Sequence, residues 1–298
     1  MRARRLRERT VYQILAHMIM ITLCILVLLP FMVLLMSSFT DETTAIVNGY
    51  SLFPEKFSLE AYKYIINRFD VIGRAYAITI VVTLVGTTLS MIITSLMAYG
   101  LSQPKLPGRS FLMFLVVFTM LFNGGLIPTY LLVRDLGLYN NMWSLILPGC
   151  ISMYNVIIMR SYFTNSLPYE IQEAAMIDGC SNIRMLIKIV MPLSMPVIAV
   201  ILLYHAVGYW NTYFSALIYL ADAEKYPLQL VLRDILISSQ VSEMMDSMDS
   251  ADSVIQQALL ANSIKYSLIV VSSVPVIVIY PLLQKYFEKG IMLGSVKG

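Results

Sequence analysis

The chain has 298 residues, of which 58% are hydrophobic and only 13% are charged. Because soluble domains carry about 25% charged residues, this composition is typical of a membrane protein. The net charge of +3 is not gathered into a basic stripe with interleaved aromatics, which argues against nucleic acid as a partner. The three cysteines show no pairing pattern and no CxxC motif, so neither a disulfide framework nor a metal site is indicated.

Six apolar segments are long enough to cross a membrane as helices, since a spanning helix needs about 20 mostly apolar residues. They lie at about 14–36, 72–101, 111–132, 142–162, 197–220 and 266–286. The first is too long for a signal-peptide core and lacks a small-residue cleavage site after it, so we expect it to remain as a span. The sequence therefore predicts an all-α membrane protein with six transmembrane helices, forming a single domain over 1–298.

Basic residues near the span ends predict the orientation, because Lys and Arg are retained on the cytoplasmic side. Five arginines precede the first span and place the N-terminus inside, and six spans then bring the C-terminus to the same side. In this arrangement 13 of the 21 basic residues, but only 5 of the 18 acidic residues, face the cytoplasm. The prediction includes long outer loops at about 38–71 and 221–265, and a cytoplasmic segment at about 163–196 between spans four and five.

The third span is irregular, because "NGGLIP" at 123–128 interrupts its outer end. Gly and Pro there free backbone groups that need protein or water partners. A broken helix beside a wet cavity is one interpretation, and a short span followed by an outer loop is the other. The sequence does not decide between them, since both residues are frequent in membrane helices.

The cytoplasmic segment predicts two short helices. Pro168 suits a helix start, and Glu170 and Glu173 complement the positive end of the helix dipole. Gly179 can adopt the left-handed conformation that ends the first helix, which we expect over about 169–178. A second helix can begin near Ser181 or Asn182 and then repeats apolar residues along one face. Spacing alone would support only a helical connector lying in the membrane interface.

Residue identity goes further than spacing in "EAAMIDGCSNIRMLIKIVMP", residues 173–192. Glu-Ala-Ala is followed after three residues by Gly, after nine more by Ile, and after one more by Met-Pro. This resembles the signature of ABC importer permeases, E-A-A-x3-G-x9-I-x-L-P, and departs from it only at Met191. The resemblance implies that the first helix is the coupling helix, which sits in a cleft of a separate ATPase subunit. The residues given this role are Glu173, Ala174, Ala175, Ile177, Asp178, Gly179, Ile189 and Pro192.

Four further stretches look like carbohydrate-importer permeases, in particular the maltose-importer-like inner-membrane subunits and those for complex oligosaccharides or polysaccharide fragments. They are "FNGGLIPTYLL", "YWNTYFSALIYL", "YPLQLVLRDIL" and the terminal "QKYFEKGIMLGSVKG". The resemblance implies a multi-pass protein of a bacterial plasma membrane that imports carbohydrate by alternating access. The implied partners are a second homologous permease in a heterodimer, a cytoplasmic ATPase, an extracytoplasmic solute-binding protein and membrane lipid.

The chain has no phosphate-binding loop of the form G-x-x-x-x-G-K-[ST], so ATP and Mg²⁺ are expected in the partner ATPase. We expect no cofactor, no catalytic residue and no enzymatic activity in this chain. An ion-coupled secondary transporter would carry carboxylates inside its spans, and the six apolar cores have none. Two lone histidines and unclustered cysteines make an intramembrane enzyme a poor interpretation. An importer of another solute, such as a peptide, stays an alternative.

Polar and aromatic residues of span five predict part of a substrate pathway, because polar side chains inside a bilayer usually face a cavity or another helix. The alternative is that Trp210 and Tyr213 belong to an aromatic belt and that His205 is a satisfied interhelical group. The candidate pathway residues are Tyr209, Trp210, Asn211 and Tyr213, with weaker candidates Tyr154 and Asn155 in span four and Asn123 and Tyr130 near the break in span three. The acidic outer segment 243–252 is interpreted as a solvated loop, or else as a face for the binding protein.

Overall fold

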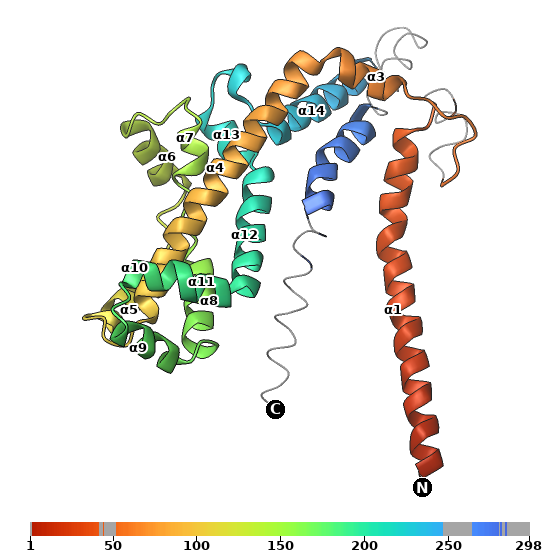
Figure 1. The fold of residues 1–298 in the computed structure, drawn as a ribbon. Helices are drawn as coiled ribbons and strands as arrows, with labels where there is room; N and C mark the ends of the chain where they lie inside the picture. Colours follow the sequence, from red (N-terminus) through yellow and green to blue (C-terminus); the bar gives the residue numbers. More distant parts are fainter. Residues whose placement is uncertain are drawn as a thin grey trace. The chain divides into compact units, whose positions relative to one another are not determined.

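The computed structural model describes residues 2–41, 44, 52–246, 264–279, 281 and 284, and helices dominate this part of the chain (Figure 1). The one extended pairing among these residues is an isolated antiparallel bridge between Thr40 and Phe57. The predicted all-α class is therefore confirmed for the described residues. The chain divides into two compact units, Met1–Phe69 with Asp234–Ser273 and Asp70–Arg233 with Val274–Gly298.

The first unit contains α1 (Arg2–Ser38), α3 (Glu60–Asn67) and the beginning of the helix Ile264–Ile279. The C-terminal end of α1 is held by hydrogen bonds. Ser38 Oγ lies 2.8 Å from Tyr62 Oη, and the backbone carbonyl of Ser38 accepts a bond from Ser267 Oγ at 3.2 Å. The most apolar stretch of α1 is 0% buried within the chain, which leaves its surface available to lipid or to another chain.

The second unit is arranged about the 34-residue helix α4 (Phe69–Ser102). The helices that follow are α5 (Arg109–Leu121), α6 (Leu126–Asp135), α7 (Trp143–Ile146), α8 (Met153–Asn165), α9 (Tyr169–Ile177), α10 (Asn182–Met185), the π-helix η1 (Leu186–Val190), α11 (Met191–Leu193), α12 (Met195–Trp210), α13 (Phe214–Tyr219), the 3-10 helix η2 (Ala223–Lys225) and the beginning of α14 (Leu228–Asp246), which belongs to the first unit from Asp234 onward. In Figure 1, α9, α10 and α11 gather at the C-terminal end of α4.

Two apolar clusters fix α4 to its neighbours. The first, called the anchoring cluster below, joins the C-terminal half of α4 to α8, α10, η1 and α12, and its buried members are Met91, Ala98, Tyr99, Met159, Phe163, Met185, Leu186, Val190, Val197, Ile198 and Ile201. The second joins the N-terminal half to α7, α12, α13 and α14 through Val82, Leu145, Ile146, Tyr209, Ala216, Leu220 and Leu230. Gly86 lets the Tyr209 ring lie on the α4 backbone, since a Cβ at Gly86 would lie only 2.7 Å from Tyr209 Cζ.

The first two predicted spans lie within continuous helices. Residues 14–36 fall inside α1 and 72–101 inside α4, and both helices are long and apolar enough to cross a membrane. The third span falls on a helix pair, α5 and α6, bent by 110°, and Asn182–Leu193 with α12 forms a second pair, bent by 91°. Counting each bent pair as one span, the described residues offer up to four spanning helices by length and composition. Six spans therefore stay a prediction.

The fourth and fifth predicted spans are not single helices. The segment 142–162 is interrupted between α7 and α8. Pro148 in this interruption has no N–H to donate to a helix, and Gly149 would lose more backbone entropy in a helix than other residues do. The segment 197–220 is divided because α12 ends at Trp210 and α13 begins only at Phe214. The sixth span, 266–286, is helical through Ile279. The acidic segment 243–252 is described only as far as Asp246, and residues 285–298 lie outside the described part.

Candidate functional site

The helix predicted at about 169–178 is present as α9, and it ends as the sequence predicts. Gly179 has φ +75°, the left-handed conformation that glycine adopts without a Cβ clash. Its N–H donates to Met176 O at 3.0 Å, and the N–H of Cys180 donates to Ala175 O at 2.9 Å. These two bonds form a Schellman motif, which satisfies carbonyls that a helix end leaves free. The turn between α9 and α10 therefore has a fixed geometry.

One face of α9 is attached to the body of the second unit. Gln172 is buried, and its Oε1 accepts a hydrogen bond from Gln103 Nε2 at 3.2 Å, which ties α9 to the loop after α4. The small side chain of Ala175 packs against the anchoring cluster. α9 is therefore attached both to the loop after α4 and to the anchoring cluster, which also contains residues of α8 and α12.

The other face of α9 is open. Glu173, Ala174 and Asp178 are exposed, and the side chain of Ile177 is 86% exposed. Ile183 on α10 and Ile187 on η1 are also exposed, but they line a separate apolar hollow beside α4 and α12. An exposed apolar surface with acidic neighbours is typical of a protein interaction site.

The remaining signature residues lie on the path from α9 to α12. Ile189 is half-buried in η1, a π-helix between α10 and α11, and π-helices are frequent at functional sites. Pro192 is exposed at the start of α11, directly before the sharp bend that leads to α12. The eight predicted coupling residues therefore belong to one continuous stretch that begins on the open face of α9 and ends at the bend.

A polar cavity of about 480 Å³ lies elsewhere in the second unit, between the α7–α8 interruption and α12. Its lining residues are Ser144, Leu145, Pro148, Gly149, Ser152, Asn155, Tyr204, His205, Gly208, Tyr209, Thr212 and Ser215. Asn155 Nδ2 lies 3.2 Å from His205 Nε2, a hydrogen bond that the amide donates and that joins α8 to α12. His205 is therefore a satisfied interhelical group at the cavity wall, as the alternative interpretation expected. Hydroxyl, amide and imidazole groups together can hydrogen-bond a neutral polar solute.

Tyr209 holds the wall of this cavity together. It is buried, its Oη lies 3.0 Å from Ser90 Oγ on α4, and it donates to the carbonyl of Ile146 on α7 at 3.1 Å. Trp210 is also buried, with its ring edge-on to Tyr76 at 5.9 Å between centroids, and so it lies inside the unit and not in an exposed belt. Tyr209 and Trp210 thus fix α12 to α4.

The structure brings together only some of the predicted pathway residues. Asn155 and Tyr209 line the cavity. The others do not line it. Asn211 is the C-cap of α12, and its Oδ1 accepts from Gln229 Nε2 at 3.5 Å, while Tyr213 and Tyr154 are exposed. In the break between α5 and α6, Asn123 Oδ1 accepts from Gly125 N at 2.9 Å, and Tyr130 on α6 stacks on Tyr219 with 6.2 Å between ring centroids. The cavity adds Ser144, Ser152 and Ser215, which carry no recognisable signal in the sequence.

Comparison with known proteins identifies the chain's relatives. Residues 75–293 match the family described as "Binding-protein-dependent transport system inner membrane component". The chain is 44% identical to the polygalacturonan/rhamnogalacturonan transport system permease protein YtcP of Bacillus subtilis, over 98% of this chain and 100% of that protein. It is 42% identical to Protein LplC of the same bacterium, over 91% of this chain and 90% of that protein.

A solved structure is also similar over nearly the whole chain. It is that of a bacterial ABC transporter involved in the import of the acidic polysaccharide alginate. The TM-score is 0.81 with 30% sequence identity, and the match covers 94% of this chain and 98% of that one.

Proposed function

This chain belongs to the family of inner membrane components of binding-protein-dependent transport systems, and we propose that it is the permease subunit of an ABC importer for polysaccharide-derived oligosaccharides. It is a transport subunit of a bacterial plasma membrane and not an enzyme. Permeases of this kind work with a separate ATPase and a solute-binding protein, so the self-sufficient secondary transporter is discarded. The family predicted from the signature at 173–192 is confirmed.

The cargo class is supported by relatives along the whole chain. The permease of 44% identity is named for polygalacturonan and rhamnogalacturonan, and the structural neighbour for alginate. A third relative, 27% identical over 97% of both chains, is the arabinooligosaccharides transport system permease protein AraQ of Bacillus subtilis. All three names refer to polysaccharides or oligosaccharides, and none to a peptide. The cavity beside α12 is lined by neutral hydrogen-bonding groups of the kind that sugar hydroxyls require.

The observation that carries the proposal is the two-sided arrangement of α9. The Gln172 and Ala175 side is fixed to the body of the second unit, and the side with Glu173 and Ile177 is open. We propose that α9 is the coupling helix and that its open side docks into the ATPase. Closure of the ATPase pair would then move α9 together with α4, α8 and α12, and so switch the permease between inward and outward conformations.

The proposed topology has six spans in one domain over 1–298, with both termini and α9 in the cytoplasm. Its support is the distribution of Lys and Arg among the loops. In this topology the two bent helix pairs, α5 with α6 and 182–193 with α12, are embedded in the membrane. The N-terminal end of α5 then lies at the cytoplasmic surface. Irregular backbone at membrane depth is tolerated where it lies in protein or lines a cavity.

We propose a second, related permease as a further partner. The most apolar stretch of α1 is uncovered within the chain, so its surface is available to a second chain. A path for an oligosaccharide needs walls from more than one bundle of this size. The heterodimer would complete it.

Affinity purification of this chain in mild detergent tests the proposal, followed by mass spectrometry of bound proteins. We expect a companion permease and an ATPase with a phosphate-binding loop. The purified complex is then placed in liposomes with its binding protein, and ATP hydrolysis is measured with oligogalacturonides, arabinooligosaccharides or peptides. Stimulation by an oligosaccharide supports the proposal, and stimulation by peptides alone overturns the cargo class. A chain that transports without ATP would overturn the coupling mechanism.

A further inference from the structure

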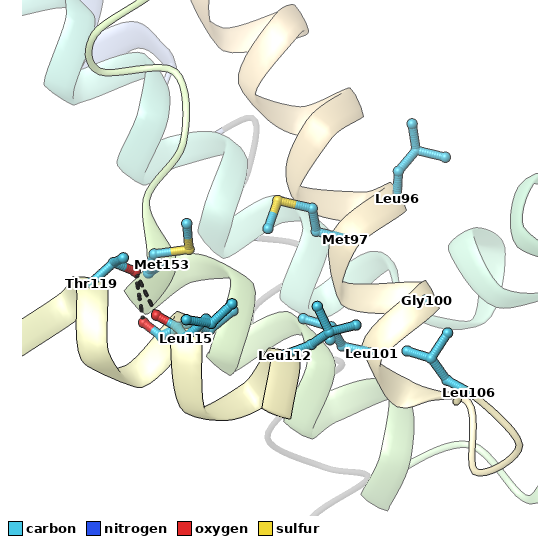
Figure 2. A pocket seen from close by; sticks show the side chains of 10 residues that line it. Leu96, Met97, Gly100, Leu101, Leu106, Leu112, Leu115, Thr119 and Met153 are labelled. Atoms are coloured by element: carbon cyan, nitrogen blue, oxygen red, sulfur yellow. Dashed lines mark hydrogen bonds between the residues drawn. The ribbon is translucent and has the colours of Figure 1, made fainter. Parts of the chain in front are cut away.

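A second cavity, of about 370 Å³, opens between α4, α5 and α8 (Figure 2). It is distinct from the polar cavity and shares none of its lining residues. Its volume falls within the range of about 300–1,000 Å³ that is usual for small-molecule pockets. Its lining residues are Leu96, Met97, Gly100, Leu101, Leu106, Leu112, Leu115, Val116, Thr119 and Met153.

The cavity offers almost nothing to a polar ligand. Its one polar side chain, Thr119, donates its hydroxyl to the carbonyls of Leu115 and Val116 at 3.0 and 3.1 Å, and Figure 2 shows these bonds directed back into α5. Its floor is the buried cluster of Leu101, Val116 and Val156. Water needs two to four polar partners to stay in a cavity, so the occupant must be apolar.

Three basic residues adjoin lining residues at one end of this cavity. Lys105 precedes the lining residue Leu106, and the N–H of Arg109 donates to Leu106 O at 3.4 Å. Arg160 reaches the same end from α8, where its Nε donates to the carbonyl of Leu101 at 3.4 Å. Within the part of the chain that the structure describes, none of the three forms an ion pair with a carboxylate.

We propose that this cavity holds one acyl chain of an anionic phospholipid from the inner leaflet, with the phosphate bound by Lys105, Arg109 and Arg160. The inference rests on the topology proposed above, which places these residues at the cytoplasmic surface. Anionic lipids are enriched in that leaflet, and basic pockets between helices on that side bind their head groups. From Leu112 to Thr119, α5 rises about 10 Å, room for part of an acyl chain along the helix.

A phospholipid suits this site better than a helix of the partner permease. The cytoplasmic ends of membrane helices are themselves rich in Lys and Arg, so a partner would bring more positive charge to a place that already holds three unpaired cations. A phosphate brings the missing negative charge and also satisfies several N–H donors of the guanidinium groups.

Gly100 gives a direct way to fill the cavity. Gly100 lines the cavity, and a Cβ built on it meets no atom within 4 Å, so a side chain can be started there toward the cavity. Gly100→Phe therefore blocks the acyl chain, while the double variant Lys105→Gln with Arg109→Gln removes head-group charge and leaves the cavity empty. Leu84→Phe is a matched control, because Leu84 is exposed on the same helix and lines neither this cavity nor the polar one.

The test is native mass spectrometry of the intact, delipidated transporter complex titrated with dioleoyl phosphatidylglycerol or dioleoyl phosphatidylcholine. We expect one phosphatidylglycerol to bind more tightly than phosphatidylcholine, to be lost in Gly100→Phe, and to be retained in Leu84→Phe. The double charge variant should weaken binding about fivefold for each cation removed. Equal affinity for the two lipids, or unchanged binding in both the filled and the charge variants, overturns the proposal. The titration uses neither ATP nor cargo, so failure of the proposed transport function would leave its outcome unchanged.

Discussion

The open face of α9 and the polar cavity beside α12 lie in the same unit but are built in opposite ways. α9 is a contiguous segment whose shape is set locally, by the Schellman turn at Gly179 and a single hydrogen bond from Gln103. The cavity is assembled from two stretches that lie apart in the sequence, 144–155 and 204–215, and Tyr209 joins α12 to both α4 and α7. A surface made by one helix can be disrupted by one turn, whereas a cavity made by several helices depends on how closely they pack.

The largest effect is expected at the turn that ends α9. Proline fixes φ near −65° and has no N–H, so Gly179→Pro can form neither the φ of +75° nor the bond to Met176. We expect uptake to fall to background and the ATPase to dissociate, while capture of cargo by the binding protein persists. Uptake into proteoliposomes and co-purification of the ATPase measure this.

The chain supplies a matched control for that change. Gly137, after α6, has φ +71° and ends its helix with the same pair of bonds, from Gly137 to Arg134 and from Leu138 to Val133. Gly137→Pro should disrupt a helix-ending turn to a similar extent, but Gly137 is distant in sequence from the coupling segment, so the ATPase should still co-purify. Loss of the ATPase from both variants, or from neither, would contradict the role of α9.

Packing should matter next, at Gly86. A methyl group there would come within 2.7 Å of the Tyr209 ring, and overpacking of this kind costs about 1–3 kcal/mol. Gly86→Ala should therefore lower the thermal stability of the purified complex and reduce transport by shifting the cavity wall. Gly100→Ala on the same helix meets no atom and should instead stabilise it by about 0.5–1 kcal/mol. Equal changes in thermal stability for Gly86→Ala and Gly100→Ala would show that the close contact of Gly86 with Tyr209 does not determine stability.

The same contrast decides what could be predicted from the sequence. The eight predicted coupling residues lie within the single stretch 173–192, and the helix start, the turn at Gly179 and the family signature all depend on residues close in sequence. The helical class and the approximate positions of α1 and α4 follow from apolar runs in the same way. These features could be predicted without knowing which segments pack together in the folded chain.

The cavity could not be predicted as fully, because its members come together only through tertiary packing. Trp210 and Asn211 follow Tyr209 directly, yet one packs on Tyr76 and the other caps α12, since neighbouring residues on a helix point in different directions. Ser144 and Ser152 join the site because the helix breaks between them, at Pro148 and Gly149. The apolar run at 142–162 predicted one continuous span, because a helix break inside an apolar run changes its composition very little.

A smaller effect is expected for cargo recognition in the cavity. Asn155→Leu removes the amide that bonds His205 and one hydrogen-bonding group of the lining. One lost hydrogen bond costs about 0.5–1.5 kcal/mol, so the KM for oligosaccharide uptake should rise up to about tenfold, with ATPase coupling preserved. The neighbouring exposed residue gives the control, Tyr154→Phe, which should leave KM unchanged. If KM responds to the control and not to Asn155→Leu, the cavity is not on the cargo path.

The smallest effect on transport is expected at the tether between α4 and α9, although its cost in stability is not the smallest. This change tests whether α9 is rigid because of its turn or because of its contacts. Gln103→Leu leaves the buried amide of Gln172 without its partner, at a cost of about 1–3 kcal/mol, whereas replacing both amides by Leu can be nearly neutral. Stimulation of ATP hydrolysis by the loaded binding protein should therefore fall severalfold in Gln103→Leu and recover in Gln103→Leu with Gln172→Leu, with the KM for cargo constant in both. Recovery would show that the body of the protein moves α9 through packing, with the hydrogen bond serving to satisfy a buried group. A double variant as impaired as the single one would instead make the amide pair itself the connection between the cytoplasmic helix and the end of α4.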